Sequence, residues 1–218
     1  RAQELYARPG RHLMSDAVLE RMIAQLLGLN FEQSVFAWQG GEPTLAGIDF
    51  FQRVVALQQK HGRPGQSVSN SLQTNGVLID EAWCRLFQEY NFLIGLSMDG
   101  PPEVHDAVRK TAGGRGTWER IMESTRTMDR FNVSYNVLCV VNKTNVDMGA
   151  DLLRWFIDHG FYYLQFIPCL EPGLQHNVPV EAYGRFLCDT FDYWAREGFG
   201  KVSVRDFDSM LTTELGLP

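Results

Sequence analysis

The amino-acid sequence predicts an α/β protein built around a parallel β-sheet. Short apolar runs of strand length alternate along the chain with longer segments of helical periodicity. Successive apolar runs begin about 24 to 41 residues apart, which leaves room for one helix and two loops between each pair. Strands that run parallel to each other need a crossover of this length, so the alternation predicts either an open doubly wound sheet or a barrel.

The expected strands are short and rich in Val, Phe, Tyr and Ile, the residue types that favour extended chains. They comprise residues 34–38, 68–73, 92–97, 133–141 and 161–167. The expected helices carry an apolar stripe and recognisable terminal residues. They are a helix capped by Ser15 that ends near Gly28, residues 49–60, residues 81–90 capped by Asp80, residues 118–130 capped by Thr117, a helix capped by Asn145 and closed by Gly160, residues 180–196 with Pro179 at a first helical position, and residues 206–215. The chain opens on a helix, so we expect that the strand preceding it is missing.

Length and charge limit the classes of function. The chain has 218 residues, 44% of them hydrophobic, which is enough to bury a full core in one domain, or at most two. It has 20 Lys and Arg residues against 26 Asp and Glu residues, and the net charge of −6 argues against nucleic acid as a partner. No apolar run approaches the roughly 20 residues needed to span a bilayer, so we expect no membrane association.

The cysteines are scattered along the chain. Cys84, Cys139, Cys169 and Cys188 show neither CxxC nor CxxxCxxC spacing. This spacing is untypical of a secreted disulfide framework and favours a reducing cytosol, hence a cytoplasmic protein. We expect Cys84, Cys139 and Cys188 to be small hydrophobes buried in the core.

Polar and Gly-rich segments follow each of the expected strands. In parallel α/β folds the carboxyl ends of the strands meet at one edge, where ligands bind. Any one of these segments is an ordinary turn, because Gly, Asn and Asp supply the backbone angles that turns need. All of them at the same edge favour one ligand site. The segments are residues 39–44, 74–76, 97–101, 142–143 and 168–171.

The residue types at this edge narrow the ligand. Gly40 and Gly41 allow a close approach of the backbone, and Glu42 adds a negative charge, which suits an ammonium group. A second set could hold hydroxyls and a carboxylate, with its arginine as a bidentate clamp. This set is Asn75, Ser97, Asp99 and Arg109. A ligand with an amine, a carboxylate and ribose hydroxyls would fit these residues.

Two members of this region have competing interpretations. Arg109 is either a ligand-binding residue or a surface cation paired with Asp106 or Glu103. His105 is either a general base or, more often for an isolated histidine, a structural hydrogen-bond partner. The other histidines have no metal-ligand spacing, and the chain has no G-x-S-x-G nucleophile elbow.

Residues 36–45, with the sequence FAWQGGEPTL, resemble the GGEP segment of radical S-adenosylmethionine enzymes. The resemblance is strongest to the anaerobic sulfatase-maturating group, which carries an added C-terminal iron–sulfur domain of the SPASM type. Further segments resemble the family in the family's own order, from about Met14 to the C-terminus. They are residues 73–76, 96–101, 105–109, 140–143 and 164–171.

This resemblance implies a partial (β/α)₆ barrel of the TIM-like type, with residues 1–218 as a barrel core truncated at both ends. It implies that Gly40, Gly41 and Glu42 hold the methionyl amine of S-adenosylmethionine. It assigns the other cofactor-binding roles to Asn75, to Ser97 and Arg109 at the ribose and carboxylate, to Asp99 nearby, and to Leu170 at the adenine. Gln39 and Gln73 would face the peptide substrate. The catalytic residue itself stays unassigned.

The resemblance also implies an activity. The family uses a 5′-deoxyadenosyl radical to oxidise a Cys or Ser of a peptide or unfolded sulfatase to formylglycine, with a reductant such as flavodoxin or ferredoxin. The alternatives are maturation of another ribosomal peptide, a non-catalytic S-adenosylmethionine-binding module, or an unrelated barrel enzyme acting on a small carboxylate.

One departure from the family is large. The CxxxCxxC motif, whose thiolates bind the 4Fe–4S cluster, is absent from the sequence and is expected just upstream of Arg1. The chain therefore carries no metal ligands of this kind, and we expect it to be inactive on its own.

Overall fold

A computed structural model describes residues 13–170 and 177–216. Their strands form one six-stranded sheet in the order β1-β2-β3-β4-β5-β6, and the pairs β1–β2, β4–β5 and β5–β6 are parallel. The α/β class predicted from the sequence is confirmed. The strands are β1 (Gln33–Trp38), β2 (Ser67–Thr74), β3 (Leu93–Ser97), β4 (Tyr135–Val141), β5 (Tyr163–Pro168) and β6 (Ser203–Val204).

The chain divides into two compact units, which we describe separately. The first unit contains the described residues up to Ile94 together with Ser124–Ser134. The second contains Gly95–Glu123 and the described residues from Tyr135 onward. One helix, α6 (Trp118–Arg130), begins in the second unit and ends in the first.

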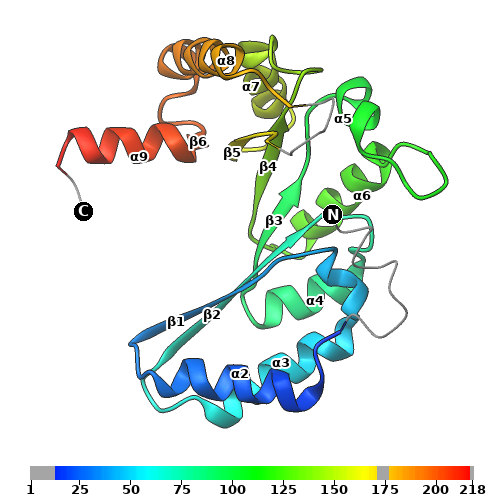
Figure 1. Ribbon diagram of the computed structural model, residues 1–218, viewed down its shortest axis with the longest axis vertical. Helices are drawn as coiled ribbons and strands as arrows, with labels where there is room; N and C mark the ends of the chain where they lie inside the picture. The colour runs from blue at the N-terminus through cyan, green and yellow to red at the C-terminus, as the bar shows by residue number, and fades with distance from the viewer. Residues whose placement is uncertain (1–12, 171–176, 217–218) are drawn as a thin grey trace. The chain divides into compact units, whose positions relative to one another are not determined.

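In the first unit, helices pack against one another around an aromatic core. They are α2 (Asp16–Gly28), the 3₁₀-helix η1 (Pro43–Ala46), α3 (Ile48–His61) and α4 (Glu81–Glu89). Figure 1 shows α2 and α3 side by side. Phe51 of α3 lies at the centre, with ring-centroid distances of 5.7 Å to Trp38 and 5.6 Å to Trp83. Edge-to-face pairs of this kind add to the free energy gained from burial alone.

The predicted caps of two of these helices are confirmed. The Ser15 hydroxyl accepts a hydrogen bond from the Val18 amide at the start of α2. The Asp80 carboxylate accepts hydrogen bonds from the amides of Ala82 and Trp83 at the start of α4. Each cap satisfies backbone donors that the first helical turn cannot pair internally.

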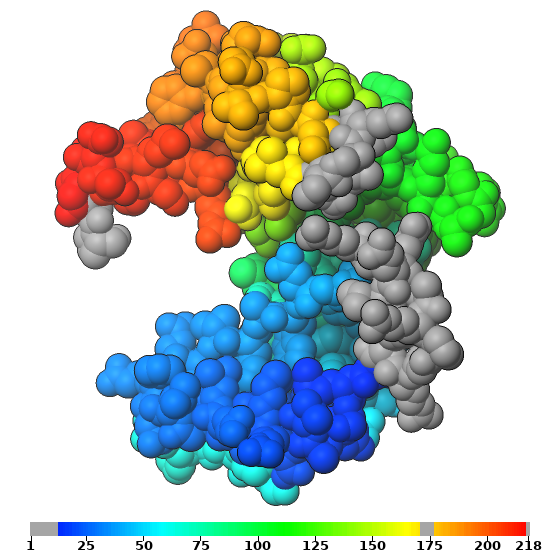
Figure 2. Space-filling view, in the orientation of Figure 1, coloured from blue at the N-terminus to red at the C-terminus, as the bar shows by residue number. Residues whose placement is uncertain are grey.

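In the second unit, aromatic side chains join β5 to two helices. These are α7 (Gly149–Asp158) and α8 (Val180–Tyr193), which pack against each other. Phe166 of β5 lies 6.3 Å from Phe156 of α7 and 5.2 Å from Phe186 of α8, between ring centroids. In the space-filling view, α8 forms part of the outer surface of this unit, in orange (Figure 2). The unit also contains α5 (Pro102–Val108) and α9 (Arg205–Glu214).

Several predicted boundaries are wrong. Strand β4 begins at Tyr135 rather than Val133, because the Val133 amide donates to the Met128 carbonyl at the end of α6. Asn145 does not cap α7, whose N-cap position is Met148. Pro179 occupies the N-cap position of α8 rather than its first helical position, and α8 ends at Tyr193, where a π-helical turn, η2 (Trp194–Gly198), follows.

Three short elements escaped the sequence analysis: η1, α5 and β6. The helices η1 and α5 have four and seven residues, too few to show a helical period, and β6 has only two residues, too few to show a strand pattern. The strand expected ahead of the first helix would lie outside the described residues.

Cysteine burial follows the predictions in part. Cys84 and Cys139 are buried, as expected, but the prediction for Cys188 is wrong because its side chain is exposed. The buried positions of α8 are Ala182, Phe186 and Thr190, at four-residue spacing, and position 188 falls on the opposite face. Among the helices of residues 13–170 and 177–216, none is long and apolar enough to cross a membrane.

Candidate functional site

The GGEP loop follows β1 directly and begins with two glycines in unusual backbone conformations. Gly40 has φ +115° and Gly41 has φ +55°. A Cβ atom at Gly40 would meet nothing within 4 Å, so the backbone conformation, rather than lack of space, requires glycine there. Gln39, Gly40 and Gly41 are exposed. The loop therefore presents its peptide groups to solvent, where a ligand can reach them.

Glu42 fastens this loop to the end of β2. Its Oε1 accepts hydrogen bonds from the Thr44 amide (3.1 Å), the Thr44 hydroxyl (2.6 Å) and the Thr74 hydroxyl (2.7 Å). Its Oε2 accepts a hydrogen bond from the Asn75 amide at 2.8 Å. All these donors are neutral, so the negative charge is held in place without a counter-ion among them. A carboxylate oxygen can accept two hydrogen bonds, so Oε2 can still accept one from an ammonium group.

Asn75 shapes the turn after β2. Its Oδ1 accepts from the Val77 amide, and the hydroxyl of the preceding Thr74 accepts from the Gly76 amide. The hydroxyl of Ser124 donates to the carbonyls of Gly76 and Ile79 and thereby ties the turn to α6. These contacts occupy Oδ1 of Asn75 and leave its Nδ2 group as the donor that could meet a ligand hydroxyl.

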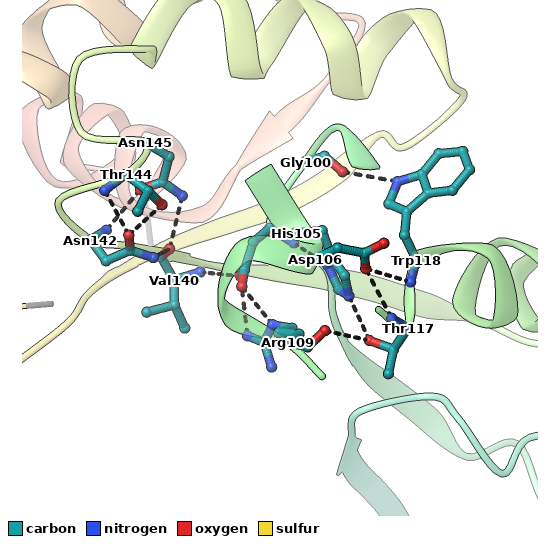
Figure 3. Close-up of polar contacts among 11 residues, drawn as sticks. Gly100, His105, Asp106, Arg109, Thr117, Trp118, Val140, Asn142, Thr144 and Asn145 are labelled. Atoms are coloured by element: carbon teal, nitrogen blue, oxygen red, sulfur yellow. Dashed lines mark hydrogen bonds and ion pairs between the residues drawn. The ribbon is translucent and has the colours of Figure 1, made fainter. Parts of the chain in front are cut away.

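In the second unit, Asp99 and Arg109 form a bidentate ion pair. Nε of Arg109 donates to Oδ2 of Asp99 at 2.5 Å, and Nη2 donates to Oδ1 at 3.1 Å. Oδ1 also accepts the Val140 amide of β4 at 2.9 Å (Figure 3). Only 1% of Asp99 is exposed, against 24% of the Arg109 side chain. Arg109 therefore pairs with neither Asp106 nor Glu103, the partners considered from the sequence.

His105 supports this pair as a neutral structural residue. Its Nδ1 accepts from the Asp99 amide at 3.2 Å, which places its proton on Nε2, 3.0 Å from the Thr117 hydroxyl. The Thr117 hydroxyl donates in turn to the Arg109 carbonyl at 3.3 Å. His105 is fully buried, and this burial lowers its pKa to about 4. The structural interpretation of His105 is confirmed.

Asp106 acts at the start of α6 rather than on Arg109. Its Oδ1 accepts the amides of Thr117 and Trp118, while the Trp118 indole donates to the Gly100 carbonyl (Figure 3). Because Gly100 follows Asp99 directly, these contacts attach the loop after β3 to α6.

The turn after β4 is held by two buried asparagines. Asn145 accepts the Asn142 amide through Oδ1 and donates to the Val140 carbonyl through Nδ2. Asn142 Oδ1 accepts from the amide and hydroxyl of Thr144 (Figure 3). Asn145 therefore stabilises a turn and not the helix start predicted from the sequence, and the N-x-x-N spacing is the sequence signal for this turn.

The remaining predicted site residues lie at separate places on the chain. Ser97 is the last residue of β3 and is half-buried, and Gln73 is half-buried near the end of β2. Leu170 is 66% exposed just after β5. The last residue of the segment 168–171 lies outside the described residues.

The described residues offer groups that suit parts of S-adenosylmethionine, but they do not offer ligands for a 4Fe–4S cluster. In the first unit, the exposed glycine peptides and the remaining acceptor position of Glu42 suit an ammonium group. In the second unit, taken by itself, the partly exposed guanidinium of Arg109 suits a carboxylate. For the cluster, no group of three or more His, Cys, Asp or Glu side chains is placed to hold a metal in the described part of the chain. Burial raises the pKa of the Cys84 thiol to about 11 and raises that of Cys139 well above its usual value, which disfavours the thiolates that a cluster needs. The cluster therefore does not fit these cysteines.

Comparison with known proteins decides the family. Residues 4–156 match the Radical SAM superfamily. The chain belongs to this superfamily. It is 38% identical over 211 residues to a cysteine-type anaerobic sulfatase-maturating enzyme of Clostridium perfringens, with 93% of this chain and 57% of that protein covered. It is 33% identical over 233 residues to a serine-type enzyme of Bacteroides thetaiotaomicron, with coverages of 97% and 56%.

Solved structures agree with this placement. The structure described as native anSMEcpe with bound AdoMet and Cp18Cys peptide superposes with a TM-score of 0.90 at 38% identity, covering 96% of this chain and 60% of that one. Streptococcus suis SuiB bound to precursor peptide SuiA has a TM-score of 0.68 at 14% identity, with coverages of 90% and 43%, and shows a similar fold. The chain thus spans somewhat more than half the length of the sulfatase-maturating relatives it matches.

Proposed function

We propose that this chain is the S-adenosylmethionine-binding core of a radical enzyme that oxidises a Cys or Ser of a sulfatase to formylglycine. The observation that carries this proposal is the 38% identity over 93% of the chain to a sulfatase-maturating enzyme. The described side chains support it, because they provide an anionic loop for an ammonium and a guanidinium for a carboxylate.

The proposal assigns residues to the ammonium, the carboxylate, the ribose and the adenine of S-adenosylmethionine. The peptides of Gly40 and Gly41, with the charge of Glu42, bind the methionyl ammonium. Arg109 binds the carboxylate, and Ser97 and Asn75 bind ribose hydroxyls. Asp99 holds Arg109 in place. Leu170, which is 66% exposed, packs on the adenine.

S-adenosylmethionine and a 4Fe–4S cluster supply radical chemistry when bound, and this chain's residues orient the reactants and exclude water. We place the peptide substrate against Gln39 and Gln73, and we assign electron supply to a flavodoxin or ferredoxin. The scattered spacing of the cysteines in the sequence suits a reducing cytosol as the site of this reaction.

The test uses the complete gene product, reconstituted anaerobically and supplied with a low-potential reductant. Incubation with sulfatase peptides that differ only in Cys or Ser at the target position should yield 5′-deoxyadenosine and an aldehyde-containing peptide, both measured by mass spectrometry. The matched control is the same peptide with Ala at the target position, which should yield no aldehyde.

The alternatives separate in the same assay. Cleavage of S-adenosylmethionine without conversion of either peptide would point to another ribosomal peptide and overturn the sulfatase assignment. Binding without any cleavage would favour a non-catalytic binding module. Absence of S-adenosylmethionine binding would overturn the proposed function altogether.

A further inference from the structure

The ion pair between Asp99 and Arg109 determines which edge of the guanidinium is open. A guanidinium group has two hydrogen-bonding forks, one formed by Nε with Nη2 and the other by Nη1 with Nη2. Asp99 occupies the first fork, through contacts of 2.5 Å and 3.1 Å. Nη1 forms no hydrogen bond within residues 13–170 and 177–216. The second fork therefore remains available to another planar anion.

Both halves of this pair are anchored by further contacts. The Val140 amide donates to the Asp99 carboxylate at 2.9 Å, and His105 accepts the Asp99 amide at 3.2 Å. The backbone of Arg109 is held where its carbonyl accepts the Thr117 hydroxyl at 3.3 Å. Asp99 is 1% exposed, so it lies too deep to meet a ligand itself, whereas 24% of the Arg109 side chain is exposed. The carboxylate thus acts on a ligand only through the arginine.

We propose that Asp99 is a positioning residue that turns the Nη1–Nη2 edge of Arg109 toward a ligand carboxylate. This inference rests on the proposed function, in which Arg109 binds the carboxylate of S-adenosylmethionine. A fork held in one orientation loses less conformational freedom when it binds a planar carboxylate than a mobile side chain does. Asp99 therefore sets the preference for ligands that carry a carboxylate, and its removal weakens that preference without removing the arginine.

The test compares S-adenosylmethionine with its decarboxylated analogue, which lacks only the carboxylate. Binding of both is measured by equilibrium dialysis on the complete gene product with its cluster reconstituted. Wild-type protein should prefer S-adenosylmethionine about 10- to 100-fold, as expected for a charged bidentate contact. Arg109→Gln should abolish this preference, and Asp99→Asn should reduce it about tenfold because the amide cannot accept from both Nε and Nη2.

The matched control is Asp106→Asn, the same chemical change at a carboxylate whose bonds within the described residues are to the amides of Thr117 and Trp118. Asn keeps the accepting Oδ1, so this variant should retain the wild-type preference. A second readout needs no ligand: the Nε–H resonance of Arg109 should be protected from hydrogen exchange in wild-type protein and in Asp106→Asn, and lose its protection in Asp99→Asn. If Asp99→Asn does not fold, Asp99→Glu keeps the charge pair but displaces the fork by one methylene, and it should also reduce the preference.

The outcomes separate the inference from the proposed function. Equal weakening of both ligands in Asp99→Asn would assign Asp99 a purely structural role and overturn the inference. A second outcome would also overturn the inference: Arg109→Gln loses the preference for S-adenosylmethionine, but both Asp99 variants keep it. In that case the role of Arg109 would stand. A wild-type preference in Arg109→Gln would overturn the proposed role of Arg109 and the inference with it.

Discussion

Glu42 in the first unit and Asp99 in the second hold a carboxylate in different ways. Within the described part of the chain, Glu42 accepts hydrogen bonds only from neutral groups: the amide and hydroxyl of Thr44, the hydroxyl of Thr74 and the amide of Asn75. Asp99 is paired with the guanidinium of Arg109 and also accepts the Val140 amide. The charge of Glu42 is therefore free to act on a cation, whereas that of Asp99 is compensated within the chain. Two acidic residues in similar sequence positions, each just after a strand, therefore have different tasks.

The largest loss of stability is expected when the ion pair between Asp99 and Arg109 is broken. Arg109→Ala should lower the free energy of unfolding by about 3–5 kcal/mol, because Asp99 would stay buried without its counter-ion. Urea denaturation of the variant and of wild-type protein at pH 7 measures this loss. A loss below about 1 kcal/mol, the value typical of an exposed pair, would show that Asp99 is not compensated in the way described.

The buried His105 should make stability depend on pH. Its pKa is about 4 in the folded chain, against 6.5 for an ordinary histidine, so both states are mainly neutral at pH 7. Between about pH 6.5 and pH 4 the unfolded chain binds a proton that the folded chain does not. The free energy of unfolding should therefore fall by up to about 3 kcal/mol as the pH falls through this window.

Proton NMR titration of His105 and denaturation curves across this pH range measure the two quantities. In His105→Gln the corresponding part of the pH dependence should be absent. A His105 resonance that titrates near pH 6.5 would contradict the neutral, buried state.

A smaller effect is expected when the charge of Glu42 is removed. Glu42→Gln should cost about 1–3 kcal/mol, because the amide nitrogen would face a donor and leave at least one of them unpaired. The control Glu32→Gln, an exposed position just before β1, should change stability by less than about 0.5 kcal/mol. Equal effects of the two substitutions would show that the contacts of Glu42 contribute nothing specific.

The smallest effect concerns a single donor to Glu42. Thr74→Val keeps the side-chain shape but removes the hydroxyl that donates to Glu42 and accepts from the Gly76 amide. Because Glu42 keeps its other donors, the expected loss is about 1 kcal/mol, measured by denaturation. A loss of about 3 kcal/mol or more would mean that the contact to Thr74 alone holds the loop.

Much of the fold could be predicted because its signals are local. Apolar spacing located the main helices and strands, and the caps Ser15 and Asp80 are confirmed, since each bonds an amide two or three residues away. The short elements and the start of β4 could not be predicted this way. Val133 belongs to a strand-like apolar run, but its amide donates a hydrogen bond to the Met128 carbonyl at the end of α6, so it does not join the strand.

The candidate site was predicted as a set of residues but not as a set of contacts. The GGEP segment and the segment from Ser97 to Arg109 were singled out from their residue types. Their partners were not, because Arg109 has several carboxylates within ten positions along the chain and composition does not rank them. The role of Asn145 was also misassigned, since a helix cap and a turn bond use the same short amide.

The sequence determined the class of sheet, the order of its strands and helices, and the family-like segments, because these depend on periodicity and on residues near each other in the chain. The choice of Asp99 over Asp106 and Glu103 as the partner of Arg109 was decided only by the tertiary structure. It depends on where β4 lies, since Val140 of that strand orients the Asp99 carboxylate across 41 positions of sequence. Hydrogen bonds need directions and distances of a few ångströms, and these exist only after distant segments have packed.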